Sequence, residues 1–177
     1  MERRIYRFFP PGAHGVGMYK TGHYGAALLV YAPVGFALLS VDPALAVLGS
    51  VGSVALSRIP DYDLRVPFLE HRGVTHTLLF LVAVAALLGA VGHQSAGAFG
   101  TDPIRTAGLG VVVALVAVGS HLLADALTPA GVPLLWPLSD RDYSADVATA
   151  SNPVANYGLL ALGVAACGAV GYLAGSV

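Results

Sequence analysis

Five long apolar stretches limit what this chain can fold into more than any other feature of its sequence. They cover residues 24–41, 43–59, 74–92, 104–128 and 154–175. Each approaches or exceeds the roughly 20 residues that an α-helix needs to cross a bilayer. The composition agrees, since 56% of the residues are hydrophobic and 11% are charged, against roughly 25% charged in soluble domains. We predict an all-α integral membrane bundle of about five transmembrane helices, with residues 1–177 forming a single polytopic membrane domain.

The basic residues predict how this bundle is oriented. With a cytoplasmic N-terminus, the cytoplasmic segments are residues 1–21, 57–73 and 129–153, and they hold every Lys and Arg except Arg105. The positive-inside rule therefore favours a cytoplasmic N-terminus and a C-terminus on the opposite side of the cell membrane. The net charge of −1 gives no overall basic field, so we expect no nucleic-acid partner.

A histidine and a carboxylate lie near the end of the fourth apolar stretch. His121 and Asp125 are four residues apart, which places them about 40° apart on one helical face. An imidazole nitrogen and a carboxylate oxygen so placed suit one divalent metal ion. The alternative is a hydrogen-bonded polar pair buried between helices. Ionisable groups in a membrane helix are costly and are by default candidates for function, which favours the metal.

Other ionisable side chains are expected at the same cytoplasmic end of the bundle. Seven candidates from four segments fall at one depth: His23, Asp61, Asp63, His71, His76, His121 and Asp125. Such ligands suit Zn²⁺, and also Mn²⁺ or Fe²⁺. Seven are more than one closed four-ligand site needs, so the pattern favours a catalytic centre or more than one ion.

The spacing of Asp61 and Asp63 carries a local prediction. In extended backbone, residues two apart face the same way, so both carboxylates would reach a metal centre, or one would bind the metal and the other act as a base. The alternatives are helix capping and solvated loop charge.

The spacing of His71 and His76 carries another prediction. On a continuous helix the two would lie about 140° apart. They converge only if His71 lies in a loop and His76 on the helix, with the bend at Gly73. Between them, Arg72 is either a fork for phosphate or carboxylate or only a positive-inside anchor.

Two longer motifs resemble the YdjM-like family of bacterial and archaeal inner-membrane proteins, which in bacteria is linked to LexA regulation. They are HRGVTHTLL at residues 71–79 and SHLLADALTPAGVPLLWP at residues 120–137. Pro60-Asp61-Tyr62-Asp63 is similar to the PDxD element of that family, and Gly22-His23 to its N-terminal histidine. The resemblance runs from about His23 to Pro137. After it, Asp140, Asp142 and Asp146 stand where a basic tail is expected.

Members of that family are described as membrane-bound metal-dependent hydrolases, and they look distantly similar to zinc-dependent phospholipase C and P1 nuclease. The resemblance implies a set of metal ligands: His23, Asp61, His71, His76, His121 and Asp125. It also implies that Asp63 is a ligand or a general base.

The function predicted from these observations is a metal-dependent hydrolase. We expect a phosphoesterase that acts on a lipid or its headgroup at the cytoplasmic interface through metal-activated water, with one or more ions. In this prediction Asp63 orients or deprotonates the water and Arg72 steadies the phosphate. The alternatives are a metal or proton transporter, which needs polar residues across the membrane, and a non-catalytic protein with a structural metal.

Overall fold

The computed structural model describes residues 17–175. The basic residues Arg3, Arg4 and Arg7, on which the predicted orientation partly rests, lie outside the described residues. His14 also lies outside them. Five long helices make up the fold: α1 (Lys20–Leu39), α2 (Pro43–Leu56), α3 (Leu78–Phe99), α4 (Pro103–Ala126) and α5 (Pro153–Gly175). Two short 3₁₀ helices, η1 (Pro60–Arg65) and η2 (Val74–His76), lie between α2 and α3.

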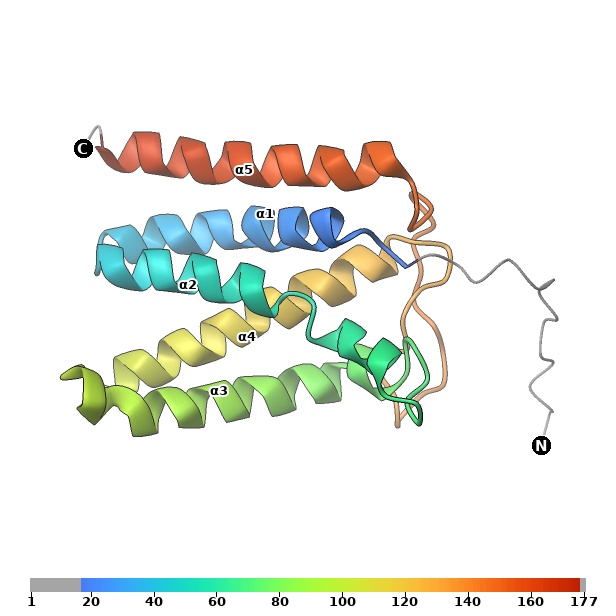
Figure 1. The fold of residues 1–177 in the computed structure, drawn as a ribbon, viewed down its shortest axis with the longest axis horizontal. Helices are drawn as coiled ribbons and strands as arrows, with labels where there is room; N and C mark the ends of the chain where they lie inside the picture. Colours follow the sequence, from blue (N-terminus) through green and yellow to red (C-terminus); the bar gives the residue numbers. More distant parts are fainter. Residues whose placement is uncertain (1–16, 176–177) are drawn as a thin grey trace, which may run out of the picture.

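The predicted fold class is confirmed. Five helical segments are long and apolar enough to cross a membrane, and successive long helices run in opposite directions (Figure 1). Among the described residues the only β pairing is an isolated bridge between Val132 and Tyr143. The chain is therefore an all-α membrane bundle.

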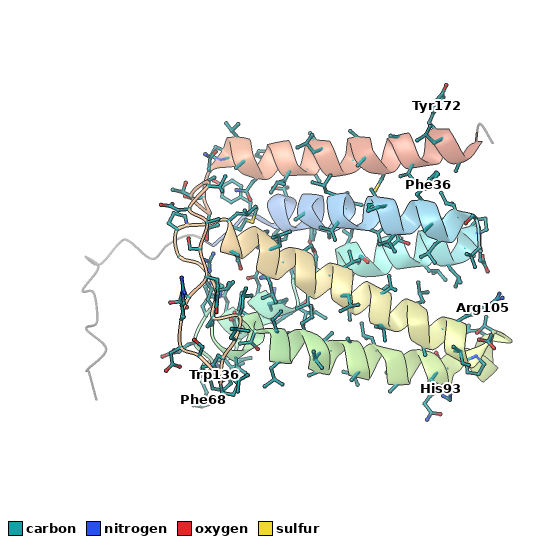
Figure 2. All side chains as sticks on the ribbon, turned by 180° about the vertical axis from the view of Figure 1, so that it is seen from behind. Phe36, Phe68, His93, Arg105, Trp136 and Tyr172 are labelled. Carbon is teal, nitrogen blue, oxygen red and sulfur yellow. The ribbon has the colours of Figure 1, made fainter. Side chains whose placement is uncertain are left out.

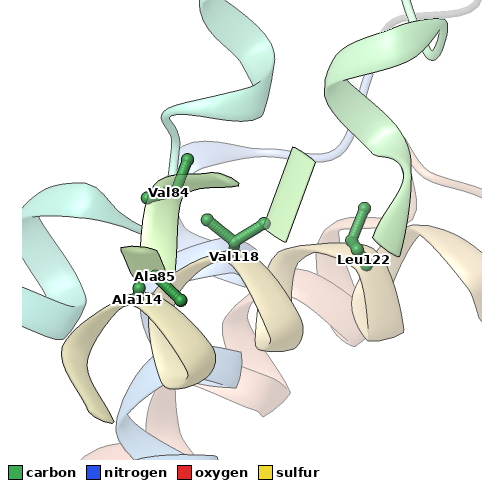
Figure 3. Packing of buried hydrophobic residues seen from close by; sticks show 5 residues of the cluster. All are labelled: Val84, Ala85, Ala114, Val118 and Leu122. Carbon is green, nitrogen blue, oxygen red and sulfur yellow. The ribbon is translucent and has the colours of Figure 1, made fainter. Parts of the chain in front are cut away.

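The helices pack in two close pairs, α5 on α1 and α3 on α4, and α2 and α4 join the pairs (Figure 1). Small residues allow this contact, as expected where helices pack in lipid. A side chain at Gly25 would collide with the backbone of α5, and one at Gly110 with the backbone of α3. Small and branched apolar residues fill the space between α3 and α4 (Figure 3): Val84, Ala85, Ala114, Val118 and Leu122.

A buried asparagine fastens α5 to the start of α1. Asn156 is 1% exposed, and its Oδ1 accepts a hydrogen bond from the Tyr19 backbone N–H at 2.9 Å. Its Nδ2 donates to the carbonyls of Ala150 and Asn152 at 2.9 and 2.7 Å. The first and last helices are therefore joined both by close packing and by a fully bonded polar side chain.

The two ends of the bundle differ in their connections. Short turns around residues 40–42 and 100–102 close one end, whereas the other end carries residues 57–77 and 127–152 (Figure 1). The longer segment is tied to α4 and α3 by backbone hydrogen bonds, from Ala145 N to Ala126 O, from Val147 N to Leu127 O and from Leu78 N to Leu134 O. The end with the longer connections is thus built as an ordered cap.

Two helix boundaries differ clearly from those predicted. Helix α3 begins at Leu78 rather than near residue 74, because the Thr77 hydroxyl caps it by accepting from Phe80 N. The same helix continues to Phe99, so the predicted end of this stretch at residue 92 is wrong. Its polar side chains point outward at the end of the bundle, and the helix ends only where Gly100 takes φ +61°. In α1, Pro33 lies inside the helix without ending it.

Candidate metal centre

Four side chains from three elements converge at the capped end of the bundle. Asp61 comes from η1, His76 from η2, and His121 and Asp125 from the last turns of α4. We call these four residues the central cluster. His121 Nε2 lies 3.1 Å from His76 Nε2, 3.2 Å from Asp125 Oδ2 and 3.5 Å from Asp61 Oδ1. His76 Nε2 lies 3.3 Å from Asp125 Oδ2. The structure therefore brings four of the seven predicted side chains together.

The hydrogen bonds of the outer ring nitrogens assign the tautomers of both central histidines. His121 Nδ1 lies 2.8 Å from the Ser57 carbonyl oxygen, and because a carbonyl only accepts, this nitrogen carries the proton. Thr75 Oγ1 donates to Asp63 Oδ2 and lies 3.0 Å from His76 Nδ1. With its proton used, that hydroxyl accepts from His76 Nδ1. Both Nε2 atoms of the neutral rings are therefore lone-pair acceptors that face one another.

One carboxylate oxygen of the central cluster is left without a donor. Asp125 Oδ1 accepts from Arg72 Nη2 at 2.8 Å, whereas Asp125 Oδ2 is buried and has no hydrogen-bond partner. Two imidazole lone pairs thus face a buried, unpartnered carboxylate oxygen. Such an arrangement costs free energy unless a cation lies between the acceptors. A divalent metal fits this donor set of nitrogen and oxygen atoms.

Burial opposes a proton as the alternative cation at His76. Its side chain is 0% exposed, and this burial lowers the pKa of His76 below the usual 6.5, although the negative charge of the nearby Asp125 acts in the other direction. The imidazole is thereby kept neutral, which is the form that binds metal ions.

Two further histidines lie beside the central cluster. The His23 ring stacks on His121 with centroids 3.9 Å apart, and its Nε2 is 3.8 Å from Asp61 Oδ2. The His71 and His76 rings meet edge to face at 5.4 Å. Two overlapping groups have ligand atoms within 4.8 Å of one another: His23, Asp61, His121 and Asp125, and Asp61, His71 and His76. Asp61 belongs to both groups, so the arrangement has room for one ion or two.

Asp63 lies behind the imidazoles rather than among the converging atoms. Its Oδ1 is 3.1 Å from His71 Nδ1, and its Oδ2 accepts from Arg72 N and Thr75 Oγ1. The same Oδ2 is 3.4 Å from His76 Nδ1. Both oxygens are thus engaged in orienting other groups, as carboxylates behind metal-binding histidines do.

The two aspartates of residues 60–63 face different ways, so the predicted extended turn is wrong. The segment is the 3₁₀ helix η1, which begins at Pro60 and has hydrogen bonds from Asp61 N to Arg58 O and from Tyr62 N to Ile59 O. At three residues per turn, positions two apart point about 120° away from each other. Asp61 and Asp63 consequently approach different nitrogens of the His76 ring, Nε2 at 4.0 Å and Nδ1 at 3.4 Å.

The turn that carries His71 and His76 also differs in detail from the prediction. His71 lies in a turn, as expected, but His76 lies in η2 and not on α3. The residue with left-handed backbone is Arg72, at φ 60°, rather than Gly73. A side chain at Gly73 would come within 2.8 Å of the Glu70 carbonyl oxygen, so glycine is needed there for space.

Arg72 points into the protein. Its Nη1 donates to Thr128 Oγ1 at 2.9 Å and to the Gly131 carbonyl at 3.0 Å, and its Nη2 donates to Asp125 Oδ1 at 2.8 Å. The guanidinium therefore joins the 71–76 turn to the end of α4 and holds Asp125 in place. These three contacts leave the predicted binding of a substrate phosphate by Arg72 without structural support.

Sequence reasoning gave no role to three groups that border the cluster. Thr75 and the Ser57 carbonyl fix the two central imidazoles, and Arg58 Nε lies 3.7 Å from Asp61 Oδ2. The position of Thr75 within HRGVTH was an available signal, whereas no pattern marks a backbone carbonyl. His93, which the sequence analysis did not count among the ligands, lies at the far end of the bundle (Figure 2).

Comparison with known proteins places this architecture in a family. The sequence profile described as YdjM inner membrane protein matches residues 18–176, which is nearly the whole chain. The chain belongs to the YdjM inner membrane protein family. Together with the five apolar helices, YdjM membership makes it a multi-pass inner-membrane protein.

Two curated YdjM relatives are similar over a shorter stretch. They are the inner membrane proteins YdjM of Escherichia coli (strain K12) and of Shigella flexneri, each 45% identical over 67 residues. That stretch is 38% of this chain and 30% of each relative, so it spans less than a third of their length. No solved structure matches the chain significantly.

Proposed function

We propose that this YdjM-family protein is a membrane-embedded, metal-dependent hydrolase that cleaves phosphoesters at the cytoplasmic interface. One observation carries the proposal. The lone pairs of His76 Nε2 and His121 Nε2 face a buried, unpartnered oxygen of Asp125, and Asp61 lies beside them. The fold alone does not require such a costly arrangement, whereas metal binding explains it.

The central cluster would hold the ion, with His23 and His71 available as further ligands. Zn²⁺ suits this set of imidazole and carboxylate donors, and Mn²⁺ and Fe²⁺ are the alternatives. The chemistry that such an ion supplies is the activation of a water molecule as a nucleophile near neutral pH.

The surrounding residues have two separate tasks in this proposal. Asp63 keeps His71 and His76 in their tautomers and orientations, and Arg72 does the same for Asp125, so both are positioning residues. His71 has 28% of its side chain exposed and its Nδ1 engaged by Asp63. If one ion is bound, His71 Nε2 remains free to exchange a proton with the substrate. If two are bound, His71 is a ligand.

A substrate would reach the cluster from the side of η1. Asp61 and His71 have 11% and 28% of their side chains exposed, whereas His76 and His121 have none. The loops on this end also expose apolar side chains, notably Phe68 and Leu138, which are 93% and 91% exposed, and Trp136 lies at the same end of the bundle as Phe68 (Figure 2). An opening among apolar loops at the end of membrane helices favours a lipid headgroup as the substrate.

The far half of the bundle argues against transport. A metal or proton path needs polar groups along its length. Between α3 and α4 the buried side chains away from the cluster are apolar, as at Val84, Ala85 and Ala114. The Tyr31 hydroxyl, between α1 and α2, is already bonded to the Ala46 carbonyl at 2.6 Å.

The proposed cytoplasmic location of the site has its own test. The basic residues at the capped end, such as Arg58 and Arg72, favour this orientation, and Arg105 lies at the other end (Figure 2). In a Cys167→Ser background, a membrane-impermeant thiol reagent added to intact cells should label Thr101→Cys and leave Asp140→Cys unlabelled. The reverse pattern would place the site on the outer side.

Elemental analysis of detergent-purified protein tests the proposal as a whole. The wild type and the control His93→Ala should contain stoichiometric metal and cleave a phosphoester from a panel of lipid and water-soluble substrates. The double variant His121→Ala/Asp125→Ala should lose both the metal and the activity. A folded wild type that takes up no metal, even after addition of Zn²⁺ or Mn²⁺, would overturn the proposal.

A further inference from the structure

We infer that Arg58 and Arg65 form a phosphate-binding subsite at the opening of the central cluster, and this inference rests on the proposed function. A phosphoesterase needs a cationic group to hold the substrate phosphate beside the metal centre. Arg72, one of whose two predicted roles was this task, has its guanidinium bonded to Asp125, Thr128 and Gly131 inside the protein. Two other arginines lie on the open side of the cluster.

Arg58 is fixed close to the cluster by its own backbone. It follows Ser57, whose carbonyl oxygen accepts the hydrogen bond from His121 Nδ1. Its Nε is buried and has no hydrogen-bond partner, and it lies 3.7 Å from Asp61 Oδ2, too far for a hydrogen bond. About a quarter of the side chain, 26%, is exposed. The Nε–H group of Arg58 is thus an unused donor beside Asp61, a candidate metal ligand, and the rest of the Arg58 side chain reaches the surface.

A shallow polar hollow adjoins this donor. Arg58, Asp61, Tyr62 and Arg65 line it, and it encloses about 10 Å³, which is room for about one oxygen atom. Arg65 lies over the exposed Tyr62 ring, with its Cζ 5.1 Å from the ring centroid. Two cationic side chains therefore line the hollow, and the contact with Tyr62 fixes the position of Arg65.

The size and charge of the hollow suit a phosphate group. One oxygen of a tetrahedral phosphate fills the hollow, and the remaining oxygens stay at the rim, where the planar guanidinium forks can bind them. Asp61 keeps one side of the hollow negative, and two arginines outweigh it. A phosphate seated there lies directly beside Asp61, and hence beside the proposed metal.

The same arginines would also be expected as positive-inside anchors, and a conservative variant separates the two roles. An anchor needs only positive charge, so Arg58→Lys would leave an anchor intact. A phosphate fork needs the planar guanidinium, which lysine does not provide. Arg141 offers a control, because it is an arginine in the loop that follows α4, at the same end of the bundle, and it does not line the hollow. Like Arg65, it lies over a tyrosine, with its Cζ 5.5 Å from the Tyr143 ring.

The experiment measures metal content and phosphate affinity on the same detergent-purified proteins. Inorganic phosphate and dihexanoyl phosphatidic acid are titrated calorimetrically into the wild type, Arg58→Lys, Arg58→Gln and Arg141→Gln, with and without bound metal. The subsite predicts unchanged metal content in all four proteins. It also predicts phosphate affinity about tenfold weaker in both Arg58 variants and unchanged in Arg141→Gln.

Each outcome of this experiment decides a separate question. Full metal content with equal phosphate affinity in the wild type and Arg58→Lys would overturn the subsite and leave the proposed hydrolase standing. A wild type without metal would overturn the hydrolase, and the titrations without metal would still test the subsite. Given an Arg58 effect, tighter binding of the phosphatidic acid than of inorganic phosphate identifies a lipid phosphate as the ligand. Equal binding identifies a water-soluble phosphoester.

Discussion

The two ends of this bundle use the same residue types in opposite ways. At the end with the short turns, the partly exposed Asp42 and the exposed Asp102 cap α2 and α4, accepting from the backbone N–H groups of Ala44 and Arg105 at 2.8 Å each. At the other end, Asp125 is buried and keeps one oxygen without any donor. Asp42 and Asp102 thus use their carboxylates to cap helices. The central cluster instead contains a carboxylate oxygen that accepts no hydrogen bond.

The histidines show the same contrast. His93 is exposed near the end of α3, while His76 and His121 are fully buried and face each other through their lone pairs. Residue type alone therefore does not identify a functional group in this chain. The site is distinguished by buried hydrogen-bond acceptors that no donor of the fold satisfies. Four experiments test this distinction.

The largest effect is expected from removing one central histidine. His76→Ala deletes an acceptor of the central cluster and should weaken metal affinity by more than about 100-fold, which exceeds the usual loss for a group behind the ligands. His93→Ala, at the other end, should leave metal affinity unchanged. Competition titrations with a zinc chelator measure both. If His76→Ala and His93→Ala bind metal equally well, the two ends of the bundle do not differ in metal binding.

A smaller loss is expected when the carboxylate behind the imidazoles becomes an amide. Asp63→Asn keeps the shape but places an NH₂ group against groups that now donate to the carboxylate, so metal affinity should fall about 10- to 100-fold. Asp102→Asn is the matched control, since asparagine caps a helix about as well as aspartate. If Asp63→Asn binds metal like the wild type, Asp63 does not orient the histidines.

The fork of Arg72 offers a third test. Arg72→Lys keeps the charge but cannot hold Asp125, Thr128 and Gly131 together, so we expect metal affinity to fall about tenfold, in the range known for groups behind metal ligands. Arg105→Lys, at the opposite end, should have no effect. Full metal affinity in Arg72→Lys would show that Asp125 is held well enough by α4 alone.

The smallest effect concerns acidification of chelator-treated protein. Burial lowers the pKa of His76 in the folded state below its value of 6.5 in the unfolded chain. Below pH 6.5 the unfolded state therefore binds more protons than the folded state, and stability falls with falling pH until the folded pKa is reached. The contribution of His76 is at most about 1.4 kcal/mol per pH unit. Thermal unfolding between pH 7 and 5 should show a shallower slope for His76→Asn than for His93→Asn.

Much of the fold follows from the sequence because the bilayer imposes a simple rule. A span needs a continuous apolar run, so the five runs identify the five helices. The meeting of the polar side chains was also predictable, because His23, Asp61, His76 and His121 all lie where runs begin or end on one side. The exact ends of the helices could not be predicted, since α3 starts where Thr77 provides a cap and continues past His93.

The division of roles within the site could not be predicted from the sequence. Asp61 and Asp63 point in different directions because η1 is a 3₁₀ helix. Residues two apart share a face in extended backbone but point apart in a 3₁₀ helix. Arg72 has a left-handed backbone and an inward-facing guanidinium, and the residue type predicts neither. Long-range partners such as the Ser57 carbonyl leave no mark in the local sequence.

The joining of α5 to α1 has a consequence for how the protein is made. Because α1 is synthesised before α5, the face of α1 around Gly25 lacks its packing partner until α5 is inserted. The backbone N–H of Tyr19 likewise lacks its hydrogen-bond acceptor, Asn156 Oδ1, until then. Such a contact between helices far apart in the sequence is slow to form, and until then α1 must remain in lipid or be sheltered by the insertion machinery. A chain that stops before Pro153 should therefore keep α1 open to cross-linking at Gly25→Cys, whereas the complete bundle should bury that position.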